Sequence, residues 1–421
     1  MYNVVELFSG IGSQVKALKN VEMRIGKAYT CDWDIHAMCA YDAIHNSPDL
    51  PFNSLKIKKS EILERLSKLT LSNDGKESMD LDSLKSYSIS VLRRIYVAIE
   101  RSNNFIDVST LSGKLIPDNI NLITYSFPCQ DLSNVGAFHG YNKGIDKKSG
   151  SRSSLLWQVG RILREMRRAG KKLPRFLLME NVPTLLSNRH RPNFEKWISA
   201  LKRLGYVNKY YQLNANDFGL PQNRPRLLMI SVQVGEDEIL KKSIKNYFKN
   251  KTAEDIVCDY KESPYYNKLY IKDLLRIDYS DQQLFSEACE CTPNDTPSRR
   301  QIWVDNPQLV RKGNVINSDY DMIPTITTKQ DRNPNSGNLY FNSKTKGKSK
   351  YRYLTPRECF LFMGFTDEDF DRIIKYNPET HKGSSLFSRD KLIRMAGNSI
   401  PVKLLEGIFL QIKNIDSMFF K

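Results

Sequence analysis

Short apolar runs alternate with stretches of helical spacing along the first half of the chain. The apolar run at 3–8 is typical of a buried strand, and a glycine turn at 10–12 leads from it into a helical stretch at 13–18. This order of strand, turn and helix opens a nucleotide-binding α/β unit. The same patterns predict further strands at 27–31, 121–126, 175–179, 207–213 and 227–232, and further helices at 34–45, 154–168 and 193–204.

Two regions depart from this alternation. Residues 47–104 carry helical spacing and no obvious chemistry, so we expect a helical insertion there. Residues 235–345 lose clear periodicity and are rich in Lys, Asn, Asp, Ser and Tyr. A long region without clear elements is either disordered or functional, and we interpret this one as a small domain that meets the partner. The predicted organisation is a catalytic and cofactor-binding domain at 1–234, the small domain at 235–345 and C-terminal helices at 346–421 that return to the first domain.

The charge balance of the chain favours a polyanionic partner. The 421 residues include 64 Lys and Arg against 47 Asp and Glu, which gives a formal charge of +17 and a pI of about 9.4. Each phosphate that such a surface neutralises releases condensed counterions, although a merely basic protein would show the same balance. No stretch reaches the roughly 18 apolar residues of a membrane helix, and the N-terminus lacks the pattern of a signal peptide.

Cysteine and histidine usage argues against a cross-linked or metal-bound fold. The seven cysteines include no CxxC pair, and none of the five histidines stands at metal-ligand spacing to another. We therefore expect no disulfide scaffold and no metal, and a reducing cytoplasm as the compartment.

A candidate cofactor loop follows the first strand. Gly10 and Gly12 form a GxG turn, and Asp32 ends the second strand, where an acidic side chain bonds ribose hydroxyls in nucleotide-binding units. Each feature has an ordinary alternative. A GxG turn often arises by chance, Asp32 or Asp34 could cap the next helix, and Trp33 could stack on an adenine or only fill the core.

Candidate catalytic side chains follow the later strands. Cys129 lies where the strand at 121–126 ends, an edge at which ligands bind in open α/β sheets. A cysteine there can be a nucleophile, although a lone cysteine is more often a small buried hydrophobe. The glycine-rich polar loop at 131–152 favours function, because such a loop can close over a substrate.

A carboxyl group and two arginines complete the set. Glu180 ends the next strand at the same edge, where an unpaired carboxyl is costly to bury; it could instead cap the following helix. Arg224 and Arg226 are two residues apart, and on a strand they would face the same side. The alternative is a solvated basic edge.

The ordered series of these segments resembles the cytosine-5 DNA methyltransferases. The resemblance spans residues from about 3 to 410, apart from the insertion and most of 235–345. The segments FSGIGSQ and TYSFPCQDLS are most similar to small bacterial members, including some that recognise CG. The matching segments are Phe8-Ser9-Gly10-Ile11-Gly12, Phe127-Pro128-Cys129-Gln130, Glu180-Asn181-Val182, Gln222 with Arg224 and Arg226, Arg357-Glu358 with Met363-Gly364-Phe365, and Gly397-Asn398-Ser399-Ile400-Pro401-Val402.

The resemblance implies a Rossmann-like S-adenosylmethionine-dependent methyltransferase domain with a smaller target-recognition domain. It implies that Cys129 attacks C6 of a flipped-out cytosine, that Glu180 engages N3, and that Arg226 holds O2 with Arg224 beside it. The implied cofactor contacts are Phe8, Ser9, Gly10, Gly12, Asp32, Trp33, Asp107, Val108, Pro128, Leu155, Asn398, Ser399 and Ile400. The implied DNA contacts are Gln130, Ser133, Arg152, Gln222, Thr325 and Ile326.

The implied partner is double-stranded DNA in a bacterial restriction-modification or epigenetic system. A cognate restriction endonuclease encoded nearby is a further candidate partner. We expect a monomer, because one flipped base needs one active site. We expect it in the bacterial cytoplasm, associated with the nucleoid. Ser13 stands where many relatives have another glycine, and the insertion is longer than usual.

Three other classes compete with this interpretation. An RNA-methylating branch of the family typically carries a Cys-Phe-Thr signature, and Cys291-Thr292 lacks the Phe. Amino-methyltransferases use a Pro-Pro-aromatic loop, and Ser263-Pro264-Tyr265-Tyr266 lacks the second Pro. A non-catalytic DNA-binding regulator on the same scaffold would have no chemical reason to keep Cys129, Glu180 and both arginines.

Overall fold

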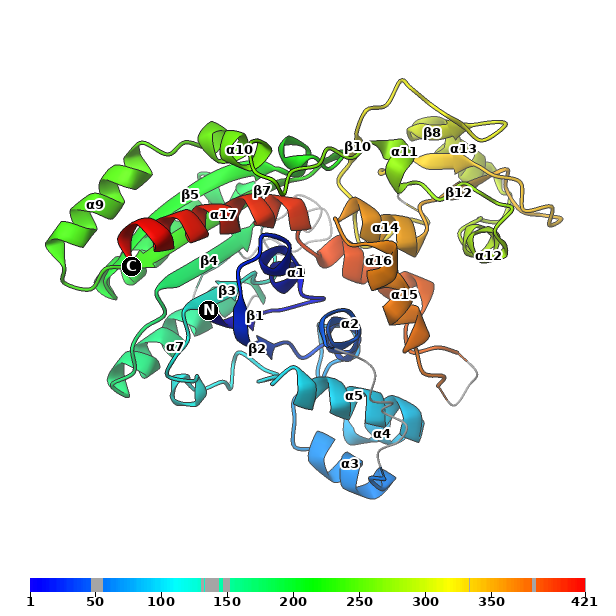
Figure 1. The fold of residues 1–421 in the computed structure, drawn as a ribbon. Helices are drawn as coiled ribbons and strands as arrows, with labels where there is room; N and C mark the ends of the chain where they lie inside the picture. Colours follow the sequence, from blue (N-terminus) through cyan, green and yellow to red (C-terminus); the bar gives the residue numbers. More distant parts are fainter. Residues whose placement is uncertain are drawn as a thin grey trace. The chain divides into compact units, whose positions relative to one another are not determined.

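A six-stranded sheet organises the first part of the chain (Figure 1). The computed structural model describes residues 1–46, 56–129, 132, 144–146, 152–332, 334–380 and 384–420. The strands lie in the order β2-β1-β3-β4-β7-β5. Their bounds are β1 (Tyr2–Leu7), β2 (Ile25–Cys31), β3 (Leu122–Tyr125), β4 (Phe176–Asn181), β5 (Tyr206–Asn214) and β7 (Pro225–Gln233). The α/β prediction is confirmed, and each predicted strand of this sheet lies within a few residues of its place.

The register of the sheet brings several strand ends to one edge. β1 pairs in parallel with β2 and β3, so that Leu7 lies opposite both Cys31 and Tyr125. β3 pairs in parallel with β4. β7 runs antiparallel to β4, with Asn181 opposite Leu227, so β7 begins where β4 ends. Four strands therefore end, and a fifth begins, at the same edge of the sheet.

Helices cover both faces of the sheet. On one face, α7 (Leu156–Arg168) and α8 (Arg191–Arg203) pack on the strands in one apolar cluster, in which Trp197 is fully buried. Side chains alternate along a strand, and on the opposite face Glu6 of β1 accepts a hydrogen bond from Val15 N of α1 (Ser13–Asn20). There α17 (Val402–Phe419) lies beside α1, because Lys413 Nζ donates to Val21 O.

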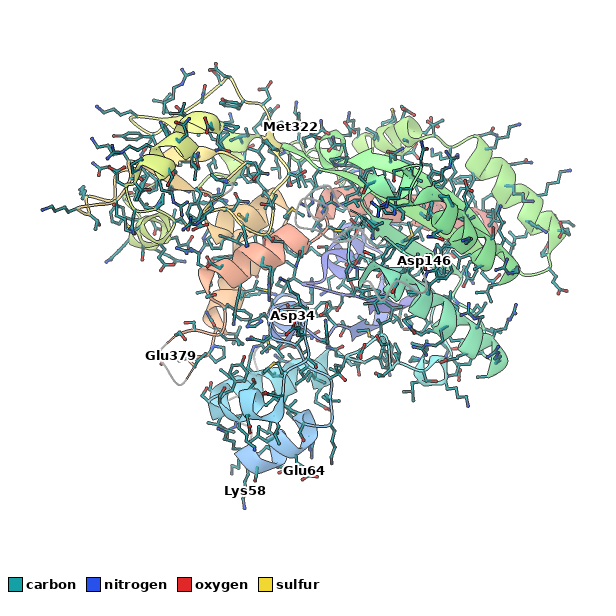
Figure 2. All side chains as sticks on the ribbon, turned by 180° about the vertical axis from the view of Figure 1, so that it is seen from behind. Asp34, Lys58, Glu64, Asp146, Met322 and Glu379 are labelled. Carbon is teal, nitrogen blue, oxygen red and sulfur yellow. The ribbon has the colours of Figure 1, made fainter. Side chains whose placement is uncertain are left out.

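The insertion is a group of helices packed on α2 (Ile35–His45). It contains α3 (Lys59–Leu66), α4 (Leu81–Lys85) and α5 (Ile89–Arg101), and its outer end carries the exposed Lys58 and Glu64 (Figure 2). The carboxylate of Asp42 on α2 is fully buried and pairs with Arg94 and, at 2.5 Å, with Arg101 of α5. Buried charges are stable only when paired, so these contacts anchor the insertion to α2.

The second compact unit comprises residues 214–224 and 266–404, and the first unit comprises the rest. Within the second unit, Arg352 and Glu358 form an ion pair with both side chains fully buried. Thr355 and Glu358 form a reciprocal capping box at the start of the helix that follows. The strands of the second unit are β6 (Gln222–Asn223), β8 (Gln308–Arg311), β9 (Val315–Ile316), β10 (Ile323–Pro324), β11 (Asn338–Tyr340) and β12 (Tyr351–Tyr353). The helices of this unit are α11 (Ile271–Leu274), α12 (Gln282–Glu290), α13 (Pro297–Asp305), α14 (Pro356–Phe362), α15 (Asp367–Lys375) and α16 (Arg389–Asn398).

The boundaries of these units differ from the predicted domain limits. The helices α9 (Glu238–Lys249) and α10 (Ala253–Lys261) belong to the first unit, so the second unit resumes at residue 266 rather than 235. Of the predicted C-terminal helices, only residues from 405 onward belong to the first unit. The polar composition of α9 and α10 hid a narrow apolar stripe, of which Ile244 and Tyr260 are fully buried.

We expect Asp42→Asn to lower the free energy of unfolding by about 3 kcal/mol. The substitution removes the negative charge with which Arg94, whose side chain is 1% exposed, pairs. A buried cation that loses its partner is strongly destabilising. Urea unfolding followed by circular dichroism measures the change.

The matched control is Asp82→Asn in α4 of the same insertion. The side chain of Asp82 is 88% exposed and pairs with Lys85 at the surface. We expect this control to change the free energy of unfolding by less than about 0.5 kcal/mol. Equal losses in the two variants would contradict an anchoring role for Asp42.

Candidate active site

The glycine loop (residues 8–12) follows β1 at the edge of the sheet where β1, β2, β3 and β4 end. Phe8, Gly10 and Gly12 all have left-handed backbones, with φ of 61°, 54° and 81°. A Cβ on Gly12 would lie 2.3 Å from Nε2 of His45, whereas one on Gly10 would meet nothing within 4 Å. Glycine is therefore required at position 12 for packing on α2, and the space beside Gly10 is open. A loop of this shape after a first strand suits a nucleotide-like ligand.

Asp32 connects the second strand to this loop. Its carboxylate accepts hydrogen bonds from Gly10 N at 2.8 Å and from Asp34 N at 3.0 Å. Desolvation, reinforced by the neighbouring charge of Asp34, raises the pKa of Asp32 to about 6. Asp34 is the residue that caps α2, since it accepts from His36 N. The capping alternative therefore applies to Asp34, and Asp32 stays in contact with the glycine loop.

The other predicted cofactor residues of the first unit lie on the same edge or beside it. Trp33 and Asp107 are half-buried, and Val108 is buried. Leu155 ends a short 3-10 helix before α7 and packs against the apolar cluster.

Cys129 is half-exposed and follows β3 in a segment whose carbonyl groups are fixed one by one. Phe127 O accepts from Asn181 Nδ2 at 3.0 Å, and Pro128 O accepts from Ser153 Oγ at 2.6 Å. The carbonyl of Cys129 itself accepts from Leu132 N at 2.9 Å. Ser153 is fully buried and Asn181 is 1% exposed. These contacts set the position of the thiol relative to β4.

Glu180 and Arg226 form an ion pair at the same edge. The distance from Arg226 Nε to Glu180 Oε1 is 3.0 Å, and each side chain is 12% exposed. In the antiparallel ladder of β4 and β7, Glu180 lies opposite Leu228. Arg226 is two residues from Leu228 on β7, so its side chain is on the same face as that of Glu180 and can reach it. Three of the predicted catalytic residues, Cys129, Glu180 and Arg226, are thus carried by adjacent strand ends. Glu180 does not cap the short helix at 183–186, whose N-cap is Val182 with no side-chain hydrogen bond.

Arg224 does not share the surroundings of Arg226. It lies between β6 and β7 rather than within a strand, so the alternation that would place both arginines on one side does not apply. Its guanidinium is buried in the second unit and donates to the carbonyls of Ile326 and Gly397 at 2.7 Å, and of Ser399 at 2.9 Å. Arg224 therefore holds backbone segments together.

The remaining predicted residues of the second unit have mixed exposure. Gln222 is fully buried, and its amide bonds Phe362 O and Ile326 N. Ile326 is likewise fully buried. Thr325 is half-buried and donates from its hydroxyl to Asn223 O. At the end of α16, Asn398 is exposed, and the next two residues, Ser399 and Ile400, are buried.

Some predicted residues cannot be placed. Gln130 and Ser133 lie outside the described residues, as do most of the loop at 131–152 and the side chain of Arg152.

Four contributing residues were not among the predicted site residues. Ser153 and Asn181 fix the Cys129 segment, and Ser126 donates from its hydroxyl to Phe8 O at 3.2 Å, joining the ends of β1 and β3. Glu6 lies fully buried beneath the glycine loop, where Tyr41 donates to it at 2.6 Å. Asn181 and Ser126 stand inside recognised segments, but Ser153 and Glu6 give no local signal because their partners are distant in sequence.

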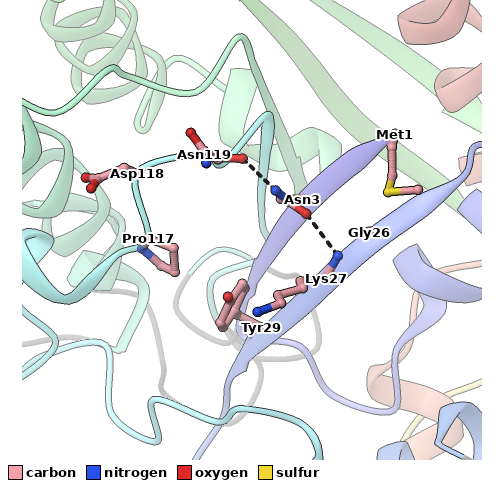
Figure 3. A pocket seen from close by; sticks show the side chains of 8 residues that line it. All are labelled: Met1, Asn3, Gly26, Lys27, Tyr29, Pro117, Asp118 and Asn119. Carbon is pink, nitrogen blue, oxygen red and sulfur yellow. Dashed lines mark hydrogen bonds between the residues drawn. The ribbon is translucent and has the colours of Figure 1, made fainter.

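A hollow elsewhere on the first unit has no part in this site (Figure 3). Its volume is about 530 Å³, and it is lined by residues at the amino ends of β1 and β2, including Asn3 and Lys27. That is the edge of the sheet opposite Cys129. Within the described ranges, no helix is long and apolar enough to cross a membrane. Among the same residues, no group of three His, Cys, Asp or Glu side chains could hold a metal ion.

Comparison with known proteins places these features in a family. A model described as C-5 cytosine-specific DNA methylase matches residues 87–414. The Type II methyltransferase M2.ScrFI of Lactococcus lactis subsp. cremoris is 31% identical over 98% of this chain and 99% of its own length. The orphan methyltransferase M.SssI of Spiroplasma monobiae is 32% identical over 96% and 95%. The chain belongs to the C-5 cytosine-specific DNA methylases.

The fold of this DNA methylase agrees with that assignment. The crystal structure of the S. pombe Dnmt2 methyltransferase is similar with a TM-score of 0.57 and 17% identity, over 100% of both chains. The predicted Rossmann-like methyltransferase fold and the predicted enzyme class, DNA (cytosine-5-)-methyltransferase, are confirmed.

The buried carboxyl of Glu6 makes the stability of the methylase depend on pH. Desolvation raises the pKa of Glu6 from its usual 4.5 to about 7. The folded protein therefore keeps a proton that the unfolded chain releases above pH 4.5. We expect the free energy of unfolding to decline as pH rises through this window, by up to about 1.4 kcal/mol per pH unit.

Urea unfolding at a series of pH values measures this slope, with Glu6→Gln as the comparison. Between pH 6 and 7 Glu6 contributes more to the slope than Asp32, whose pKa is raised only to about 6. The free energy of unfolding of the Glu6→Gln variant should change less with pH in that interval. A slope unchanged by the substitution would show that Glu6 is already ionised in the folded methylase.

Proposed function

We propose that this methylase forms a covalent bond between Cys129 Sγ and C6 of a cytosine flipped out of duplex DNA. The observation that carries the proposal is the edge at which Cys129 and the Glu180–Arg226 pair lie beside the glycine loop. C5 of an aromatic pyrimidine is a poor nucleophile, and it becomes reactive once C6 is saturated. A duplex hides both atoms, so the base has to leave the stack.

The proposed steps use Cys129 first as nucleophile and then as leaving group. The thiolate adds to C6, and the electron pair of the C5–C6 double bond makes C5 nucleophilic towards a methyl donor. Once C5 carries the methyl group, a base takes the C5 proton, and the electron pair of that C–H bond restores the double bond and expels the thiolate. A cysteine suits both steps because its thiolate is a strong nucleophile and its free pKa is about 8.5. The three fixed carbonyls around Cys129 hold the nucleophile in place, which reduces the entropy cost of the addition.

Glu180 and Arg226 are proposed to hold the flipped base. With no base bound, each compensates the charge of the other in a mostly buried position. On entry of the base, the guanidinium of Arg226 donates to O2. The carboxyl of Glu180 in its protonated form donates to N3, which offsets the charge that builds up as the thiolate adds.

The glycine loop and Asp32 fit S-adenosylmethionine as the cofactor. The open space beside Gly10 admits a ligand next to the backbone, and Asp32 keeps acceptor oxygens at the edge for ribose hydroxyls. Trp33, Asp107, Val108 and Leu155 are proposed to line the adenosine and methionine parts of this site, with Phe8, Ser9 and Pro128. When bound, S-adenosylmethionine supplies the methyl group that C5 accepts.

The second unit is proposed to recognise the DNA sequence, and its segment Asn398-Ser399-Ile400 is proposed to bind the cofactor. Thr325 is half-buried beside the buried Ile326, and Asn398 is exposed at the end of α16. Arg224 bonds both segments through their carbonyls, so we assign it a positioning role rather than a place in the base pocket. Gln222 has the same kind of role, because its buried amide bonds Ile326 N.

The biological setting is proposed from the relatives. M2.ScrFI is named a type II methyltransferase and M.SssI an orphan methyltransferase. We propose a restriction-modification or solitary epigenetic role in a bacterial cytoplasm, acting as a monomer. The seven cysteines include no CxxC pair, which fits a reducing compartment.

We expect duplex DNA that carries 5-fluorocytosine to trap the methylase through Cys129 in the presence of S-adenosylmethionine. Fluorine at C5 replaces the proton whose loss releases the thiolate, so the adduct persists and migrates as a larger species on a denaturing gel. Cys129→Ser should form no such species and should lower the methylation rate on the order of a thousandfold or more.

The matched control is Cys258→Ser, because Cys258 is an exposed thiol of α10. We expect this variant to be trapped as the unaltered chain is. An adduct that survives Cys129→Ser, or one that is lost with Cys258→Ser, would overturn the assignment of the nucleophile.

A further inference from the structure

One carboxamide joins two loops that are distant in the chain. Asn104 lies just after α5, where the insertion ends. Its Oδ1 accepts from Asp32 N at 3.1 Å and from Ile106 N at 2.9 Å, and its Nδ2 donates to Asp32 O at 2.9 Å. The backbone of Asn104 also forms a parallel bridge with Thr30 at the end of β2. A single amide thus fixes both backbone polar groups of Asp32 and the start of the segment that carries Asp107.

The segment after Asn104 is held in an unfavourable conformation. Ile106 has φ of 67°, a left-handed backbone that a β-branched residue rarely adopts. Such strain persists only where the surroundings determine the backbone, and it gathers at functional sites. Here the surroundings include the bond from Ile106 N to Asn104 and the burial of the Ile106 side chain. The strained turn directs the chain into Asp107 and Val108.

We propose that Asn104 is a positioning residue of the cofactor site, whose carboxamide sets the distance between the Asp32–Trp33 loop and the Ile106–Val108 turn. This inference rests on the proposed function, in which these two segments contact the ribose and the adenine. A ligand that spans both segments binds best when their spacing is fixed beforehand, because the ordering cost is already met in the free protein. Asn104 itself does not touch the cofactor in this proposal.

The insertion supports the same loop from a second point. Ser72 N donates to Trp33 O at 2.8 Å, and Ile35 N donates to Ser72 O at 3.0 Å. Ser72 is fully buried, and its hydroxyl donates to Glu77 O at 2.6 Å, which closes the turn that presents it. The Asp32–Trp33 loop is therefore held by Ser72 within the insertion and by Asn104 at its end. This gives the insertion a function: it forms a brace for the cofactor loop.

The test compares S-adenosylmethionine binding to the full chain without DNA, measured by titration calorimetry, with steady-state kinetics. Asn104→Ala should weaken binding about tenfold, as expected for the loss of a small hydrogen-bond network. The KM for S-adenosylmethionine should rise by a similar factor, while kcat and the KM for DNA change by less than about twofold. A purely structural role would instead lower the amount of active protein and leave both KM values unchanged.

Two further variants calibrate the result. Asn103→Gly is the matched control, because it removes the neighbouring amide at a position whose φ of 45° suits glycine. It should bind S-adenosylmethionine like the unaltered chain. Asn104→Asp keeps the acceptor oxygen and can donate to Asp32 O only when protonated. Its affinity relative to the unaltered chain at the same pH should therefore fall as pH rises, and this comparison remains available if Asn104→Ala does not fold.

Asp32→Ala separates failure of this inference from failure of the proposed cofactor site. If Asp32→Ala retains full affinity, the proposed cofactor site is overturned and the role of Asn104 falls with it. If Asp32→Ala loses affinity while Asn104→Ala keeps it, only the positioning role is overturned. Loss in both variants, with Asn103→Gly unaffected, is the expected outcome.

Discussion

The parallel register of β1, β2, β3 and β4 is the constraint on which the site depends. Because these strands end at the same edge, they bring together the glycine loop, Asp32, Cys129 and Glu180, which are far apart in the sequence. The antiparallel β7 then starts at that edge and delivers Arg226 to Glu180. The helices on both faces serve this arrangement by burying the strands, which leaves the edge as the place where polar groups can meet a ligand.

Charge compensation is the second principle of the molecule. Asp42 is paired with two arginines, Glu358 with Arg352, and Glu180 with Arg226. The carboxylates of Asp42 and Glu358 are fully buried, where loss of a partner is costly. The third lies at the strand edge, where we propose that a base with its own donors and acceptors replaces the partner of each group. The position of a pair, rather than its presence, distinguishes structure from function here.

The sequence predicted what local pattern determines. Apolar runs located the strands, and their order placed Cys129 and Glu180 at one edge. It could not separate Arg224 from Arg226, because the chain leaves the strand geometry between β6 and β7. From the sequence, the domain boundary was predicted at 235 rather than 266, because the narrow apolar stripe of α9 and α10 gave no clear helical pattern. Asn104 and Ser153 gave no signal, since each bonds a backbone group that lies 72 or 25 residues away.

The most direct test of the central claim, that this edge methylates cytosine in DNA through Cys129, is a genome-wide map of 5-methylcytosine. The chain is expressed in a host without cytosine methylation, and bisulfite sequencing compares it with Cys129→Ala. The account predicts methylation confined to one short motif and its absence in the variant, which also gives the recognition sequence. An unmethylated genome with full-length protein present, or methylation that persists in the variant, would contradict the account.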